Sequence, residues 1–352
     1  MTVQWNLDDL ETIACDICNN NEGKKVMVRP DGLQVLECLN CDLAYINPRP
    51  KSALVSRLYS REYYLDRDNQ DRKGFGYAEY LSPESVDPLI WLAQDRYALL
   101  VKHINIKDKK ILEIGCATGE FCKVASDAGA QVIGCDYSKD AIEMAHSRYP
   151  QIRFIAGELK ELDFPPESFD MIVAFEVIEH ILHPKEWMVR LSRLLRVGGQ
   201  LILSTPNYDF GRSVGVENWI GFKRSFEHLY FFSVESIRRM VIGSNLTLLA
   251  YYTSTDGMMD PSLKQPASLL IMRRAIGLLL RKLGILSSAR KIRRELGLGT
   301  KRVWINEGNE HSLFIFLEKR KPASVDLLQD EKQRNTYGDR KSPILFAELQ
   351  SD

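Results

Sequence analysis

Four cysteines near the N-terminus form two C-x-x-C pairs, Cys15/Cys18 and Cys38/Cys41. Zinc prefers four soft ligands in a tetrahedron, and each C-x-x-C turn can supply two of them. Because all four coordination positions would be filled by the protein, we expect a closed, structural zinc site.

A second group of residues stands where a predicted strand turns into a helix, in Ile111-Leu-Glu-Ile-Gly-Cys-Ala-Thr-Gly119. Gly115 and Gly119 bracket a tight turn that lets a ligand approach the backbone and a helix N-terminus. The dinucleotide fingerprint G-x-G-x-x-G is absent there. Glu113 would repel a pyrophosphate but suits a ligand with an ammonium and a sulfonium group. Asp136, which ends the next predicted strand, can accept hydrogen bonds from a ribose diol.

Two Glu-His pairs stand where an active face is expected. Glu179-His180 follows the fourth predicted strand, and Glu227-His228 lies in a loop after the fifth. A hydroxyl nucleophile needs a general base, commonly His or a carboxylate. His180, His228 and Glu179 are therefore the candidate catalytic residues, with helix capping or packing as the alternative for each histidine.

Short apolar strands alternate with helices after residue 108. This alternation predicts the fold that positions the candidate binding and catalytic residues. It is typical of a doubly wound, mostly parallel α/β sheet, whose ligands bind at the carboxyl ends of the strands. The expected strands are 111–115, 131–136, 153–157, 169–177, 199–205, 246–253 and 311–319. The expected helices are 88–104, 119–128, 139–147, 184–196 and 234–241.

Five stretches together resemble the class I S-adenosylmethionine (SAM)-dependent methyltransferases. They are ILEIGCATGEF, VIGCDYS, FIAGELKELDFPPESFDMIVAFEVIEH, LLRVGGQLILSTPN and EHLYFFS, in the order and spacing of the family. The resemblance implies a Rossmann-like, seven-stranded sheet and SAM as the cofactor. The cofactor-binding residues that it and the turn indicate are Glu113, Gly115, Cys116, Ala117, Gly119, Asp136, Tyr137, Glu158, Leu159, Phe175 and Glu176, with Tyr77 as a lid contact. Some quinone O-methyltransferases use magnesium at a similar E-x-x-E-H stretch, so Mg²⁺ on Glu176, Glu179 and His180 is an alternative to the metal-free site that we expect.

The predicted organisation has four parts. A zinc ribbon occupies residues 1–50, a helical connector or lid 51–105, the methyltransferase domain 106–321 and a disordered tail 322–352. Residues 264–302 are a helical insertion before the last strand; they carry eleven bases against one acid, with apolar residues at helical spacing. Such a helix can lie on an anionic membrane or pack on protein as a lid or dimer arm.

Composition limits the partners. The chain has 352 residues, 45% of them hydrophobic and 27% charged, and its formal net charge is +0. The predicted ribbon holds eight acids and four bases, so it lacks the clustered cations that bind phosphates. We therefore do not expect a nucleic-acid partner. The N-terminus shows no basic-then-apolar signal pattern, which predicts a cytoplasmic protein with peripheral contact at the inner face of the membrane as an option.

The ribbon and the Tyr-rich segment after it resemble the N-terminal part of bacterial methyltransferases of sugar and cell-surface glycan biosynthesis. This resemblance implies O-methylation of a small-molecule or glycan acceptor. Two alternatives remain: an RNA-modifying methyltransferase that grips RNA with the ribbon and the basic insertion, and a silent SAM-binding regulatory module.

Overall fold

The computed structural model describes residues 5–58, 86–223, 227–254, 304–306 and 311–321. The predicted lid residue Tyr77, the basic insertion at 264–302 and the tail from 322 lie outside the described residues. The described residues up to Lys319 belong to one compact unit, and Arg320 and Lys321 belong to a second.

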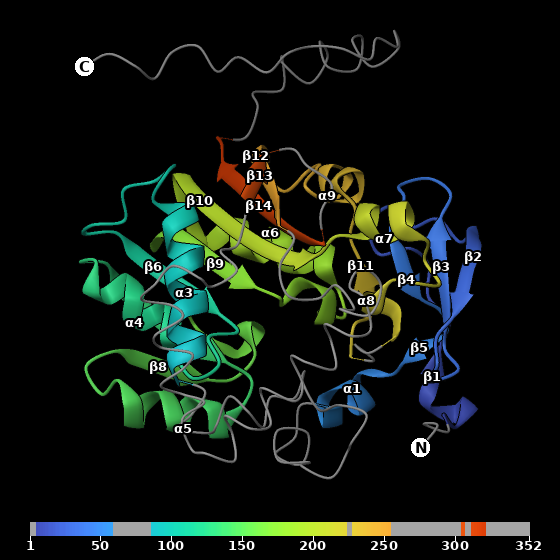
Figure 1. Ribbon diagram of the computed structural model, residues 1–352, viewed down its shortest axis with the longest axis horizontal. Helices are drawn as coiled ribbons and strands as arrows, with labels where there is room; N and C mark the ends of the chain where they lie inside the picture. Colours follow the sequence, from blue (N-terminus) through green and yellow to red (C-terminus); the bar gives the residue numbers. More distant parts are fainter. Residues whose placement is uncertain (1–4, 59–85, 224–226, 255–303, 307–310, 322–352) are drawn as a thin grey trace, which may run out of the picture. The chain divides into compact units, whose positions relative to one another are not determined.

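A large sheet carries all seven strands predicted from the sequence, together with one short edge strand, β13 (Figure 1). Its strands are β6 (Lys110–Ile114), β7 (Gln131–Asp136), β8 (Arg153–Ala156), β9 (Phe169–Phe175), β10 (Leu195–Pro206), β12 (Leu246–Ser254), β13 (Trp304–Asn306) and β14 (Ser312–Lys319). They lie in the order β13-β12-β14-β10-β9-β6-β7-β8. Strands β8, β7, β6, β9 and β10 run parallel to one another. Strand β14 is antiparallel to both β10 and β12. The mostly parallel Rossmann-like sheet is therefore confirmed.

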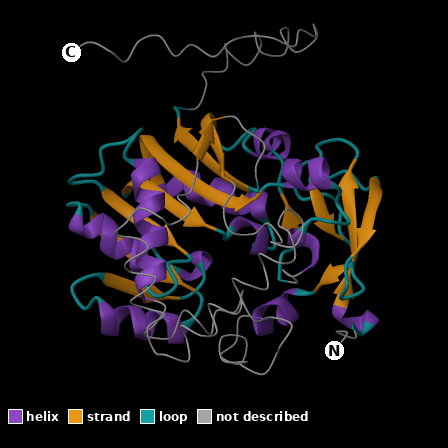
Figure 2. Cartoon of the chain, in the orientation of Figure 1, coloured by secondary structure: helices purple, strands orange, loops and turns teal. Residues whose placement is uncertain are grey.

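Helices cover both faces of this sheet (Figure 2). They are α3 (Val86–Leu100), α4 (Glu120–Asp127), α5 (Lys139–Arg148), α6 (Pro184–Leu194) and α9 (Val234–Met240). Local signals in the sequence start several of them: the Ser138 hydroxyl caps α5 by accepting from the backbone N–H of Ala141, and Pro184 opens α6.

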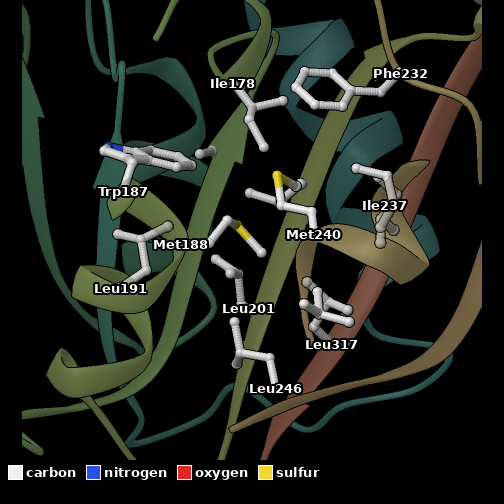
Figure 3. Close-up of a cluster of buried hydrophobic side chains, with 14 of the residues drawn as sticks. Ile178, Trp187, Met188, Leu191, Leu201, Phe232, Ile237, Met240, Leu246 and Leu317 are labelled. Atoms are coloured by element: carbon white, nitrogen blue, oxygen red, sulfur yellow. The ribbon is translucent and has the colours of Figure 1, made fainter. Parts of the chain in front are cut away.

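Apolar side chains join α6 and α9 to one face of the sheet. Figure 3 shows Met188 of α6 and Met240 of α9 meeting over Leu201 of β10. Leu99 of α3 and Phe121 of α4 belong to a separate hydrophobic cluster, which contains other residues of the large sheet. Burial of these side chains from water fixes the positions of the strand ends.

A second, four-stranded sheet contains the cysteine-bearing segment. It consists of β2 (Gly23–Val28), β3 (Gln34–Cys38), β4 (Ala44–Ile46) and β11 (Tyr230–Phe231) in the order β11-β4-β3-β2. β1 (Leu10–Glu11) pairs separately with β5 (Arg49–Pro50), and α1 (Ser52–Leu58) follows. Strand β11 comes from a part of the sequence far from the other three strands, and it pairs with β4 so that Tyr230 lies opposite Tyr45 (Figure 1).

Two further helices, α7 (Tyr208–Val214) and α8 (Ile220–Lys223), support this second sheet. Trp219 and Phe222 form a cluster with Val35 and Phe231. The cysteine-bearing segment thus shares both hydrogen bonds and core with residues 208–232. Over the described ranges, no helix is both long and apolar enough to cross a membrane.

Candidate functional site

The carboxyl ends of β6, β7 and β9 open on a cleft of about 710 Å³. This edge is where open α/β sheets bind ligands. Ten of the predicted cofactor residues line it: Glu113, Gly115, Cys116, Ala117, Asp136, Tyr137, Glu158, Leu159, Phe175 and Glu176. Gly119 instead stands at the N-cap of α4, and Tyr77 lies outside the described residues.

The turn between β6 and α4 has a left-handed backbone at three positions. Gly115, Ala117 and Gly119 have φ values of 71°, 45° and 88°. A Cβ on Gly115 would lie 2.5 Å from Cγ2 of Val177, so a side chain there would clash as well as strain the backbone. Ala117 adopts the unusual conformation without a glycine.

Asp136 anchors this turn as well as facing the cleft. Its Oδ2 accepts from the backbone N–H of Ala117 at 2.9 Å, and its Oδ1 accepts from that of Ser138 at 2.8 Å. Burial raises the pKa of Asp136, although both hydrogen bonds favour the carboxylate. One side chain therefore connects the ends of β6 and β7, the two positions that the sequence assigned to opposite ends of the cofactor.

Glu113 is a buried carboxyl group at the floor of the cleft. Its side chain is 4% exposed, and the thiol of Cys122 donates to its Oε2 at 2.9 Å. Burial raises the pKa of Glu113 to about 8, against the opposing effects of the Cys122 hydrogen bond and of the Arg96 charge. A cationic ligand would favour the ionised form, so the site suits an ammonium group.

His180 also lines the cleft, but the two other predicted catalytic residues do not. Among the described residues, Glu179 and His228 are buried next to His180 and are absent from the cleft lining. The rings of His180 and His228 meet edge to face, with centroids 4.6 Å apart. The structure thus brings the three candidates together and presents one of them to a ligand.

Glu176 does not join this group through its carboxylate. Its Oε1 accepts from the Ser204 hydroxyl at 2.7 Å, and its backbone has a φ of 55°.

The four N-terminal cysteines gather into one cluster. Sγ atoms of Cys15 and Cys41 are 3.4 Å apart, and those of Cys18 and Cys38 are 3.5 Å apart. All four Sγ atoms lie within 4.8 Å of one another. The pKa of Cys15 is lowered to about 5, chiefly because Cys41 donates a hydrogen bond to it, whereas that same bond and then burial raise the pKa of Cys41.

The donor set fits zinc. Four cysteine sulfurs this close together are the usual ligands of a structural zinc site, and a bound dication would stabilise them as thiolates. The zinc would hold together β3, the turn before β4 and the Cys15–Cys18 knuckle. Asp16 of that knuckle accepts from the backbone N–H of Lys185 at 3.0 Å, which docks the knuckle on the first turn of α6.

Several cleft residues were not predicted from the sequence. Arg49 donates from Nε to Glu11 at 2.8 Å and from Nη1 to the Leu182 carbonyl at 2.6 Å and the Tyr230 hydroxyl at 2.8 Å. Arg96 of α3 stacks over the ring of Phe175, and Glu186 and Arg190 of α6 also line the cleft. The placement of Arg49 between Pro48 and Pro50 gave no signal, because its partners are distant in sequence.

A sequence model of a family described as a methyltransferase domain matches residues 91–251. A probable S-adenosylmethionine-dependent methyltransferase of Mycolicibacterium smegmatis is 36% identical over 99 residues, which are 28% of this chain and 38% of that protein. Residues 91–251 thus match a methyltransferase domain, and the chain is similar to a protein described as a probable SAM-dependent methyltransferase. The matched stretch includes the cleft residues from Arg96 of α3 to Arg190 of α6.

Other similar proteins match less closely. A ubiquinone biosynthesis O-methyltransferase of Coxiella burnetii is 28% identical over 127 residues, 35% of this chain and 54% of that protein. A SAM-dependent methyltransferase structure from Thermotoga maritima has a TM-score of 0.47 and 14% identity, covering 74% of this chain and all of that one. The chain thus spans only 38–54% of the length of these curated relatives.

Proposed function

We propose that the protein transfers a methyl group from SAM to a hydroxyl group of a sugar or cell-surface glycan intermediate. The observation that carries this proposal is a cleft whose lining includes Glu113 and Asp136, His180, and the ion pair of Glu11 and Arg49. The first pair suits the cofactor, and we assign the last pair to the acceptor.

SAM, when bound, supplies a methyl group on a positively charged sulfur and becomes a neutral thioether when the acceptor oxygen takes that methyl. The chain then has to hold the cofactor, align the acceptor and remove its proton. Glu113 would hold the ammonium of the methionine moiety and Asp136 the ribose hydroxyls. Arg96, whose guanidinium stacks on Phe175, is suited to the cofactor carboxylate.

The acceptor end of the cleft is polar and hydrogen-bonding. The ion pair of Arg49 and Glu11 and the side chains of Glu186 and Arg190 offer planar donors and acceptors, which suit neighbouring hydroxyl groups of a sugar. His180, backed by Glu179 and His228, would activate the hydroxyl that receives the methyl group.

Mass spectrometry of candidate sugar nucleotides and glycolipids after incubation with methyl-labelled SAM tests the proposal. We expect label in one acceptor class, loss of transfer in His180→Gln, and retained SAM binding by that variant in calorimetry. Label in RNA alone, or SAM binding without transfer to any acceptor, would contradict the proposal in favour of an RNA methyltransferase or a regulatory module.

We further propose that residues 264–302 make peripheral contact with the inner face of the membrane in the cytoplasm. Their excess of ten positive charges suits anionic lipids, which would bring the cleft to a lipid-linked acceptor. Sedimentation with anionic and neutral liposomes should show charge-dependent binding, and equal binding to both would reject the contact.

A further inference from the structure

A buried polar cluster behind the cleft joins two segments of the chain. Glu179 and His180 belong to the short 3-10 helix η6 (Ile178–His180), and His228 precedes β11. One ligand atom from each residue lies within 4.8 Å of the other two. Nε2 of His228 is 3.9 Å from Oε1 of Glu179.

The Glu179 carboxyl group is fully buried, and neither of its oxygens makes a hydrogen bond of normal geometry. Burial and the nearby Glu176 raise its pKa well above the usual range. The Thr205 hydroxyl and His228 are its polar neighbours, and a buried carboxylate with so few partners is unfavourable unless it takes a proton or a cation.

Both imidazole rings are drawn into the protein interior, His228 fully and His180 in part. A neutral imidazole has one ring nitrogen whose lone pair can bind a metal ion. Nδ1 of His180 faces the Glu227 carbonyl oxygen at 3.4 Å, a contact that helps to fix the orientation of the ring.

The two segments are fixed to each other before any ligand binds. The backbone N–H of Leu229 donates to the Glu179 carbonyl at 2.8 Å. The buried guanidinium of Arg29, itself paired with Asp31, donates from Nη1 to the His228 carbonyl at 2.9 Å. The three side chains thus sit on a rigid frame, which favours a defined site over a flexible one.

We propose that Glu179, His180 and His228 hold a divalent transition-metal ion of the zinc class. Two imidazoles and one carboxylate are a ligand set of catalytic zinc sites, in which one position stays open. His180 lines the cleft, so the open position would face the acceptor.

This ligand set differs from the magnesium set considered from the sequence. The Glu176 carboxylate is engaged with Ser204, and His228 provides the third ligand instead. Magnesium prefers an all-oxygen shell, whereas imidazole nitrogens suit zinc and its neighbours. Small side-chain rotations would bring the atoms to metal–nitrogen distances of about 2.0–2.1 Å.

The ion would lower the pKa of an acceptor hydroxyl bound to its open position. This role rests on the proposed function, whereas the metal site itself does not. Metal binding and methyl transfer are therefore measured in separate experiments. A negative result for one does not decide the other.

Metal content of the purified full-length chain, reconstituted with zinc and measured by plasma mass spectrometry, tests the site. We expect two equivalents in the wild type and one in Glu179→Gln, His228→Gln and Cys15→Ser. His146→Gln, which changes an exposed histidine of α5 outside the cleft, is the matched control and should keep two. One equivalent in the wild type that only Cys15→Ser removes would overturn the proposal.

A cobalt titration of the wild type gives a second measurement that does not depend on whether the variants fold. We expect one binding event with a thiolate-to-cobalt charge-transfer band and a second event with ligand-field absorption only. A single event, carrying the thiolate band, would also overturn the site.

Discussion

The affinity for SAM should rise as the pH is raised from 6 to 7, because Glu113 must lose a proton before it can face a cation. Its carboxyl group is buried, and its pKa is raised to about 8. The protonated form therefore predominates in the free protein at neutral pH, while the bound cofactor selects the carboxylate. The sign follows directly: binding releases a proton, so higher pH favours it.

The size of the effect follows from the same pKa. At pH 7 roughly one tenth of the molecules carry the Glu113 carboxylate, and each pKa unit corresponds to about 1.4 kcal/mol. The dissociation constant should fall about tenfold between pH 6 and pH 7. An α-amino group with a pKa of about 7.7–8.0 stays protonated in this window, so the ammonium of the ligand changes little.

Calorimetry in two buffers of different ionisation enthalpy measures the proton directly. We expect release of about 0.9 protons for each cofactor bound at pH 7. Glu113→Gln should bind more weakly, with an affinity that is flat over this range, whereas Asp136→Asn should keep the slope. An equal slope in the wild type and in Glu113→Gln would refute the assignment of the titration to Glu113.

Three further predictions concern the frame of the site. Asp136→Asn should weaken SAM binding by about 1–3 kcal/mol in calorimetry, because the backbone N–H of Ala117 or Ser138 loses a charged acceptor. Gly119→Ala should lower the thermal midpoint more than Gly32→Ala: both positions have positive φ, but only the first Cβ would meet a side chain, 2.6 Å from Phe154. Cys15→Ser should remove one zinc and lower the unfolding midpoint of the N-terminal segment, with a smaller change in SAM affinity; unchanged metal content would reject the zinc site.

The sequence predicted the mostly parallel sheet well, because short apolar strands and glycine turns are local patterns. The structure places Glu113 and Asp136 in the lining of one cleft, and their role in holding a cofactor stays a prediction. The four cysteines were equally visible, since their spacing alone determines which residues can meet around a metal.

Long-range contacts explain what the sequence did not reveal. The three-residue β13 and the two-residue β11 are too short to leave a periodic pattern. Arg29 donates to the carbonyl of His228, 199 residues away, and no local sequence pattern predicts that hydrogen bond. The sequence singled out Glu179 as a catalytic candidate but not as a buried residue, and its complete burial is evident only in the structure, where it lies beside His228.

The pairing of β11 with β4 imposes an order on biosynthesis. The first fifty residues leave the ribosome long before Tyr230 is translated, and at about 5–20 residues per second the delay is roughly 10–40 s. During that interval β4 has an open edge that exposes unpaired backbone groups, a known hazard for aggregation. Early capture of a metal ion by the cysteines would hold the nascent segment in shape until its last strand arrives.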